Sequence, residues 1–111
     1  IAARLASKDA DIVKIATMAN SFADTIRMLR LVEKAKVPTI GICMGEAGVL
    51  TRILACRYGS PFTFATTSAN RKVAPGQLTF EQMKHLYRVE EITEKTKLYA
   101  VIADPVGHSL S

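Results

Sequence analysis

Lys14 is the residue of this sequence whose surroundings most favour chemistry. It lies in the middle of an apolar run, residues 11–17 (DIVKIAT), and period-2 alternation puts it on one strand face with Ile12 and Ala16. On a buried face a lysine is desolvated, which favours the neutral amine over the ammonium. A neutral amine attacks a carbonyl carbon and forms an imine. The alternatives are a strand-end lysine whose ammonium reaches water and a lysine held in a buried ion pair.

Two further polar residues lie where strand-to-helix loops are expected. Arg52 follows residues 45–48 (GEAG) by one helical turn, and its guanidinium suits a substrate carboxylate. Gln77 ends residues 74–77 (APGQ), where a rigid turn is followed by a side chain that both donates and accepts hydrogen bonds. The alternatives are a solvated helical arginine paired with a surface acid and an ordinary loop glutamine.

The histidines and the terminal serines give weaker signals. We expect His85 to lie on the surface of a helix or to pack against a neighbouring helix, rather than to take part in catalysis. His108 forms a compact polar group with Ser109 and Ser111, whose hydroxyls point the same way in an extended chain. The sequence contains no GxGxxG, Walker, GxSxG or HExxH motif, so none of those chemistries is indicated.

Three strand-like runs, each followed by a helix-like stretch, must position these residues. The strands are expected over residues 11–17, 37–43 (VPTIGIC) and 61–66 (PFTFAT), and the helices over 21–36, 45–58 and from 79 onward. The strand centres Lys14, Ile40 and Phe64 lie 26 and 24 residues apart, the spacing of consecutive βα units in a parallel sheet. An α/β protein is therefore predicted, with three units that fit either a barrel segment or part of an open sheet.

Local signals mark where the expected helices begin and end. Ser21 with Asp24, and Thr79 with a glutamine three residues on, form capping-box patterns. Gly59 is a stop signal for the second helix. The third helix is expected to bury one apolar face, made of Phe80, Met83 and Leu86.

The remaining sequence divides into a charged segment and a new strand. Residues 90–97 are charged and lack a clean apolar face, which is typical of a linker. Residues 98–103 (LYAVIA) then predict a strand, and the DPVGHS that follows reads as a loop at its carboxyl end. The expected division is a first domain over 1–89, a linker over 90–97 and the beginning of a second domain over 98–111.

Composition and charge narrow the partners. The 111 residues are 49% hydrophobic and 23% charged, as expected for a chain that builds an apolar core. The net charge of +5 is not clustered in a basic stripe, so a small anionic substrate is favoured over nucleic acid. Cys43 and Cys56 lie in apolar runs without a metal-binding or redox spacing, so we expect reduced core cysteines and no metal.

The sequence gives no sign of a membrane or secretory context. It contains no apolar run long enough to span a bilayer and no signal-peptide pattern, so a cytoplasmic location without membrane partners is expected. The chain opens on IAAR without an initiating Met and closes directly after an apolar run, so both ends look cut. The oligomeric state is not indicated.

Four spaced blocks together resemble the type I 3-dehydroquinate dehydratase family. In order, they are 11–16 (DIVKIA), 44–52 (MGEAGVLTR), 58–61 (YGSP) and 74–77 (APGQ). The resemblance covers residues 1 to about 88 and implies the last three βα units of a (β/α)₈ barrel, a fold that uses roughly 250 residues. It also implies dehydration of 3-dehydroquinate to 3-dehydroshikimate in the shikimate pathway, without metal or cofactor.

The resemblance assigns roles to five residues. Lys14 would form the imine, Arg52 would bind the substrate carboxylate and Gln77 would belong to the loop that closes over the substrate. Met44 and Tyr58 fall where the family has residues lining the pocket. Many members have a serine where Val73 stands here, so one hydrogen bond to substrate is lost. The catalytic histidine of the family lies upstream of this chain, and neither histidine present matches it.

The tail resembles the start of shikimate dehydrogenase. Residues 99–111 (YAVIADPVGHSLS) look like that family's opening strand and substrate loop, and Ser109 and Ser111 match its paired substrate-binding serines. A dehydratase running into a dehydrogenase is the arrangement of bifunctional enzymes. The second activity would use NADP, whose binding domain is absent from these residues.

Two other hypotheses stay open. A lysine-imine aldolase on a similar barrel would also use Lys14, but it would need a glycine-rich phosphate site, and residues 68–77 contain only Gly76. The isolated 111 residues are expected to be an inert partial domain, because three barrel strands leave open edges and uncovered apolar faces.

Overall fold

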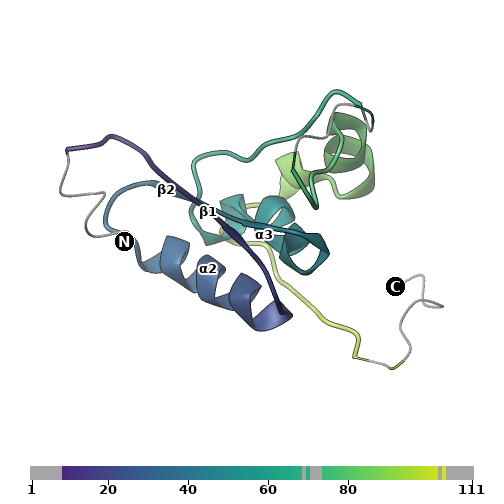
Figure 1. The fold of residues 1–111 in the computed structure, drawn as a ribbon, viewed down its shortest axis with the longest axis horizontal. Helices are drawn as coiled ribbons and strands as arrows, with labels where there is room; N and C mark the ends of the chain where they lie inside the picture. The colour runs from purple at the N-terminus through teal and green to yellow at the C-terminus, as the bar shows by residue number, and fades with distance from the viewer. Residues whose placement is uncertain (1–8, 69, 71–73, 103, 105–111) are drawn as a thin grey trace.

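Two parallel strands form the sheet that carries Lys14. The computed structural model describes residues 9–68, 70, 74–102 and 104 (Figure 1). Strand β1 (Val13–Met18) pairs with β2 (Thr39–Met44), so that Lys14 lies opposite Ile40 and Met18 opposite Met44. The first two expected strands are thereby confirmed, each beginning two residues later and ending one residue later than expected.

Helix α2 (Phe22–Lys34) connects the two strands and packs against the sheet (Figure 1). Its predicted capping box is present: the Asp24 carboxylate accepts hydrogen bonds from the Ser21 N–H at 3.2 Å and the Asn20 N–H at 2.9 Å. The alternation along β1 is confirmed as well, because Val13 and Ile15 are buried while Lys14 and Ala16 are exposed. The first βα unit is therefore specified by local pattern.

The core under the sheet depends on a glycine in β2. A Cβ built on Gly41 would lie 2.5 Å from Val32 Cγ2 and 2.7 Å from Met28 Sδ. Those contacts are shorter than any real Cβ contact, so only glycine lets α2 approach the sheet this closely. Met28 and Val32 are buried in the resulting interface.

The second expected helix is interrupted, which corrects the prediction of one helix over 45–58. The structure has a 3₁₀ turn η1 (Glu46–Gly48), a short helix α3 (Val49–Ile53) and a second 3₁₀ turn η2 (Cys56–Tyr58). After Ile53 the Ala55 carbonyl accepts both the Tyr58 and the Ser60 N–H, which tightens the chain into a turn. Ser60 Oγ then donates to the Thr39 carbonyl at 3.0 Å. Gly59, at φ +96°, ends η2 as its stop signal predicts.

The expected strand over 61–66 is not a strand. Among the described residues it forms no ladder, and its one bridge joins Thr66 to Thr79. This teal segment runs away from the sheet toward the green helical turns (Figure 1). A strand exists only where a neighbour pairs with it, and here the described residues supply none beside this segment.

The third helix has the predicted start but not the predicted buried face. Thr79 N–H donates to Gln82 Oε1 at 2.9 Å and Gln82 N–H donates to Thr79 Oγ1 at 3.1 Å, which confirms the capping box. The helix begins at Phe80 and continues as a π-helical turn η4 (Gln82–Leu86). Of the expected face only Met83 is buried, in a second core with Ile53, Leu78 and Val89. Phe80 and Leu86 stay exposed because none of the described elements covers them.

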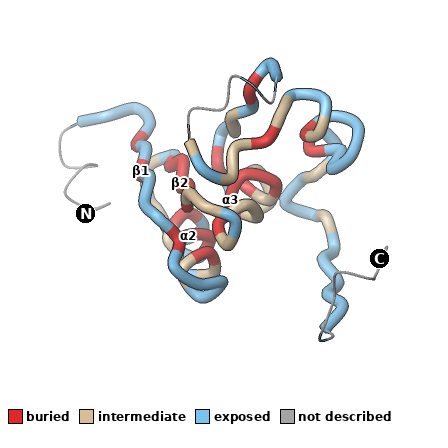
Figure 2. Tube along the Cα trace, turned by 45° about the vertical axis from the view of Figure 1, so that its right-hand side comes forward, coloured by how far each residue is buried: buried red, intermediate tan, exposed pale blue. Residues whose placement is uncertain are grey.

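The charged segment that follows makes contacts with the rest of the chain. The 3₁₀ turn η5 (Val89–Glu91) buries Val89 in the second core, and Ile92 packs beside it. Arg57 Nε donates to the Thr96 carbonyl at 2.7 Å. Residues 98–102 are exposed and form no strand (Figure 2), contrary to the strand expected over 98–103. Ala103 lies outside the described residues.

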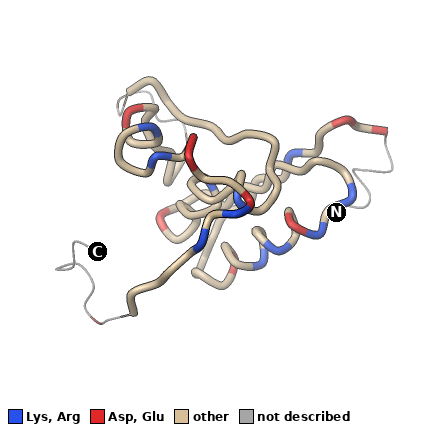
Figure 3. The backbone as a smooth tube through the Cα atoms, turned by 180° about the vertical axis from the view of Figure 1, so that it is seen from behind, with Lys and Arg blue, Asp and Glu red and all other residues tan. Residues whose placement is uncertain are grey.

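Both cysteine thiols are free, as expected. Cys43 is buried and Cys56 is half-buried, and burial raises the pKa of both thiols. The charged residues carry both signs along the described chain (Figure 3). Within the described residues, no helix has the length and apolarity that crossing a membrane requires.

Candidate functional site

Four of the residues that the sequence singled out line one cavity. This cavity, about 280 Å³ in volume, is bounded by polar and apolar side chains from β1, β2, α3, the 61–66 segment and the 74–77 turn. The predicted members are Lys14, Met44, Arg52 and Gln77. The others are Ala16, Ile42, Phe64 and Ala74. Residues up to 63 positions apart in sequence are thus brought to one place by the fold.

Lys14 projects from the β1 face opposite α2. Its Nζ lies 4.3 Å from the centre of the Phe64 ring, a cation–π distance. The expected burial of Lys14 is not found: in the part of the chain that the structure describes, Lys14 is exposed. The Phe64 ring is therefore an aromatic group in direct contact with the amine.

Sequence reasoning missed Phe64 as a residue of the site. In the sequence Phe64 marks the centre of the third strand-like run and indicates only the spacing between the strands. Which face of that run meets Lys14 depends on the route of the 61–66 segment, a long-range feature. Alternation within PFTFAT would have placed Phe62 and Phe64 on one face without choosing between them.

Arg52 is buried, with 3% of its surface exposed. Its Nε has no hydrogen-bond partner, and none of the ion pairs among the described residues involves it. Desolvation lowers the pKa of the guanidinium below its usual value. The alternative of a solvated surface arginine is therefore excluded, and an unpaired buried cation beside a cavity favours an anionic ligand.

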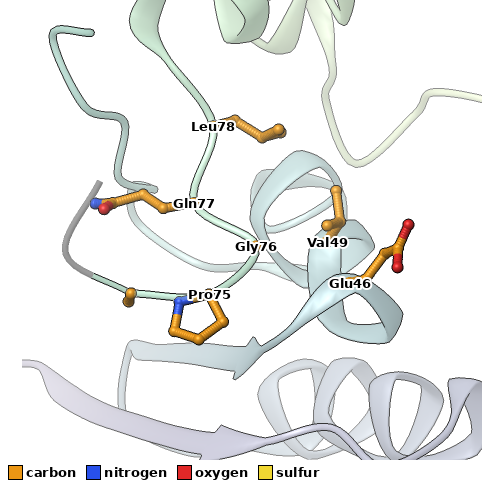
Figure 4. Close-up of a pocket in the computed structure, with 7 residues that line it drawn as sticks. Glu46, Val49, Pro75, Gly76, Gln77 and Leu78 are labelled. Carbon is orange, nitrogen blue, oxygen red and sulfur yellow. The ribbon is translucent and has the colours of Figure 1, made fainter. Parts of the chain in front are cut away.

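Gln77 belongs to a tight turn between two cavities. The Gln77 N–H donates to the Ala74 carbonyl at 3.3 Å, with Gly76 at φ +76°. Gln77 also lines a second cavity, of about 550 Å³, together with Glu46 and Val49. Figure 4 shows Gln77 and Glu46 on opposite sides of the backbone at Gly76. The turn thus separates the two cavities.

The other predicted residues lie elsewhere. Tyr58 is half-buried in η2, does not line the cavity with Lys14, and has the Arg57 guanidinium 5.5 Å from its ring centre. His85 is exposed on η4 as expected, with its Nε2 3.3 Å from Glu81 Oε2. Ser109, Ser111 and Val73 lie outside the described residues.

Two parallel strands joined by a helix, with a lysine and a buried arginine on one cavity, define an α/β protein with a candidate site. The type I 3-dehydroquinase family model matches residues 1–94. The chain therefore belongs to the type I 3-dehydroquinase family.

Individual relatives agree with this assignment. The chain is 45% identical over all 111 residues to the bifunctional 3-dehydroquinate dehydratase/shikimate dehydrogenase, chloroplastic, of Arabidopsis thaliana, of which it covers 18%. It is 43% identical over 82 residues, 74% of the chain, to the 3-dehydroquinate dehydratase of Methanocaldococcus jannaschii, of which it covers 37%. The solved 3-dehydroquinate dehydratase of Geobacillus kaustophilus superposes with a TM-score of 0.67 at 31% identity, covering 78% of this chain and 35% of that one.

The fold is thus an α/β fold similar to that of the solved Geobacillus kaustophilus 3-dehydroquinate dehydratase. The chain spans less than two fifths of the length of each of these relatives. The match to the bifunctional Arabidopsis enzyme extends through the last residues of the chain, beyond the residues that the family model covers.

Proposed function

We propose that this chain supplies the imine-forming lysine and the carboxylate-binding arginine of a 3-dehydroquinate dehydratase. One observation carries the proposal: Lys14, Arg52 and Gln77 line the same cavity. A nucleophilic amine, a buried cation and a two-sided hydrogen-bonding group are the side chains needed to bind and activate a small keto acid. The substrate class is therefore a carboxylate that also carries a ketone.

In the proposed reaction the neutral Lys14 amine attacks the ring ketone of 3-dehydroquinate. The carbinolamine loses water and leaves a protonated imine, which withdraws electrons from the neighbouring carbon and acidifies its C–H bond. A histidine from outside these 111 residues takes that proton and gives it to the departing hydroxyl, so a second water leaves. Hydrolysis of the imine releases 3-dehydroshikimate and restores the lysine.

The cavity residues would divide the remaining tasks. Arg52 would hold the carboxylate and orient the ring, so that the correct C–H bond faces the base. The Phe64 ring, 4.3 Å from Lys14 Nζ, would stabilise the positive charge of the imine nitrogen. Gln77 would bind substrate from the 74–77 turn, and Met44 would pack against it. Tyr58 does not line this cavity, so it would line the substrate pocket only in the full-length protein.

In the full-length protein we infer that residues 1–89 form the last three βα units of a (β/α)₈ barrel. Residues 90–97 would connect this barrel to a shikimate dehydrogenase domain beginning at 98–111, with Ser109 and Ser111 on its substrate. NADP would supply hydride there, but residues 98–111 contain no glycine-rich loop that could bind a nucleotide. The match over all 111 residues to a bifunctional relative supports this arrangement.

The isolated 111 residues are expected to be inactive. Lys14 is exposed in this chain, and apolar side chains such as Met18, Phe80 and Leu86 have no covering layer among the described residues. Such surface favours association. A cooperative denaturant transition of a monomeric 111-residue chain would contradict this expectation.

Borohydride trapping of the full-length protein with 3-dehydroquinate tests the proposal. Reduction fixes the imine, so a ligand-derived mass is expected on the peptide that contains Lys14. Lys14→Ala should abolish the adduct and the activity, while Lys34→Ala, at the end of α2 and away from the cavity, should change neither. If the folded wild-type protein binds the substrate without forming the adduct, Lys14 does not form an imine and has only a packing role. An adduct with a sugar phosphate instead would indicate the aldolase.

We also propose a cytoplasmic location, which the two free cysteines support. The Arabidopsis relative is named chloroplastic. Microscopy of the tagged full-length protein beside an organelle marker distinguishes the two locations.

A further inference from the structure

The turn that carries Gln77 rests on the end of β2 through two glycines. The Gly45 N–H donates to the Pro75 carbonyl at 3.0 Å. Gly76 lies so close to Gly45 that a Cβ at position 76 would overlap the Gly45 carbonyl oxygen and lie 3.0 Å from its carbonyl carbon. Pro75 and Gly76 also occupy the two central positions that a type II turn prefers, with φ +76° at Gly76. The contact is made by backbone and requires that residue 76 has no side chain.

Gly45 joins this turn to both strands. The Ala19 N–H, just after β1, donates to the carbonyl of Met44, the last residue of β2, at 2.9 Å. Gly45 directly follows Met44. A Cβ on Gly45, which has φ +93°, would lie 3.2 Å from Met18 Sδ. The strand of Lys14, the strand of Met44 and the turn of Gln77 therefore meet at one glycine.

We propose that Gly45 and Gly76 are positioning residues that hold Gln77 at the cavity lined by Lys14 and Arg52. This inference rests on the proposed dehydratase function. Both glycines act through Gln77 and touch no reacting atom. A side chain at position 76 pushes the turn off the end of β2 and moves Gln77 with it. Displacing a substrate-positioning group by about 1 Å costs up to about 10²-fold in rate.

Gly76→Ala in the full-length protein tests the contact. We expect kcat/KM for 3-dehydroquinate to fall roughly 10- to 100-fold, mainly through KM, because Lys14 itself is not moved. Gly59→Ala is the matched control: Gly59 also has a positive φ, +96°, but a Cβ there meets no atom of the described residues within 4 Å. That variant carries the backbone strain without the collision, so its kcat/KM should stay within about threefold of wild type.

A double-mutant cycle separates positioning from a structural role. Gln77→Ala removes the group that the glycines are proposed to place, so adding Gly76→Ala to it should cost less than about threefold. If Gly76→Ala does not fold, Pro75→Ala, which loosens the same turn, replaces it in the cycle. Pro75→Ala should then lower kcat/KM in the wild-type background and leave it unchanged in the Gln77→Ala background. Equal losses in both backgrounds would overturn this inference alone. A wild-type protein without dehydratase activity would overturn the proposed function and this inference with it.

Discussion

The side chain of Thr51 ties α3 to β2. Its Oγ1 accepts a hydrogen bond from the Cys43 N–H at 2.9 Å and donates one to the Gly48 carbonyl at 2.7 Å. Thr51 is fully buried, so neither backbone group has water as an alternative partner. Because Arg52 is the next residue, this pair of bonds fixes where its side chain leaves the helix.

Thr51→Val should therefore destabilise the protein although it keeps the shape of the side chain. It leaves the buried Cys43 N–H without its Thr51 partner and removes the side-chain bond to the Gly48 carbonyl, so we expect a loss of roughly 1–3 kcal/mol in the free energy of unfolding. Urea unfolding of the full-length protein measures the loss, with Thr67→Val, an exposed threonine, as control. If both variants unfold at the same urea concentration, the bonds of Thr51 do not stabilise α3 on β2.

The Asp24 carboxylate should make stability depend on pH. The Asn20 N–H bond is the largest cause that lowers its pKa below 3.8, and bonds from Ser21 and Arg27 act in the same direction. A carboxyl whose folded pKa lies below its unfolded pKa stabilises the fold above the unfolded value and loses that contribution as pH falls through the folded value. Asp24→Asn should lower Tm at neutral pH, and its difference from wild type should shrink below about pH 3.8.

Thermal unfolding followed by circular dichroism at several pH values checks this dependence. Asp11→Asn, at an exposed acid before β1, controls for the change in net charge. A Tm difference for Asp24→Asn that is the same at every pH would show that the capping box acts through its shape alone.

Features set by neighbouring residues could be predicted from the sequence. The two capping boxes, the stop at Gly59 and the alternation of Val13, Lys14 and Ile15 all depend on contacts within a few positions. The placement of Lys14 and Arg52 near each other followed from the resemblance to a family. The capping boxes, the stop at Gly59 and the alternation are confirmed because local geometry decides them.

Features set by distant partners could not be predicted. Residues 61–66 have strand composition, but a strand needs a ladder, and among the described residues the segment pairs with neither β1 nor β2. The break of the second helix follows from the Ser60 bonds to Ala55 and Thr39, which bring the chain back to the sheet. The burial of Arg52 and the contact of Phe64 with Lys14 are likewise products of packing. Periodicity has no information on any of these.

Arg57 should hold the segment after η5 against the domain. Its bond to the Thr96 carbonyl, at 2.7 Å, spans 39 positions, and Ile92 packs on the second core just before it. Arg57→Ala should let residues 93–97 open more often, so cleavage by endoproteinase Lys-C after Lys95 and Lys97 should speed up about 5- to 20-fold. This protease ignores arginine, so the substitution itself removes no cleavage site.

Arg30→Ala, an exposed arginine of α2, serves as the control for that experiment and should leave the cleavage rate unchanged. Equal rates for Arg57→Ala and wild type would mean that packing of Val89 and Ile92 alone retains the segment.

Arg52 should lower the stability of the ligand-free protein and raise its affinity for a carboxylate ligand. The guanidinium is buried, its Nε has no partner among the described residues, and burial lowers its pKa because the charged form is disfavoured there. Arg52→Met fills the same volume without the charge, so the ligand-free full-length protein should gain about 1–3 kcal/mol in the free energy of unfolding. The same variant should show no rise in Tm with quinate, a cyclic carboxylate probe that raises the Tm of the wild type. Arg52→Lys keeps the charge but loses the two-pronged geometry, so we expect KM to rise about tenfold. A ligand-free Arg52→Met protein less stable than wild type would show that the arginine is part of the packing rather than a site kept for an anion.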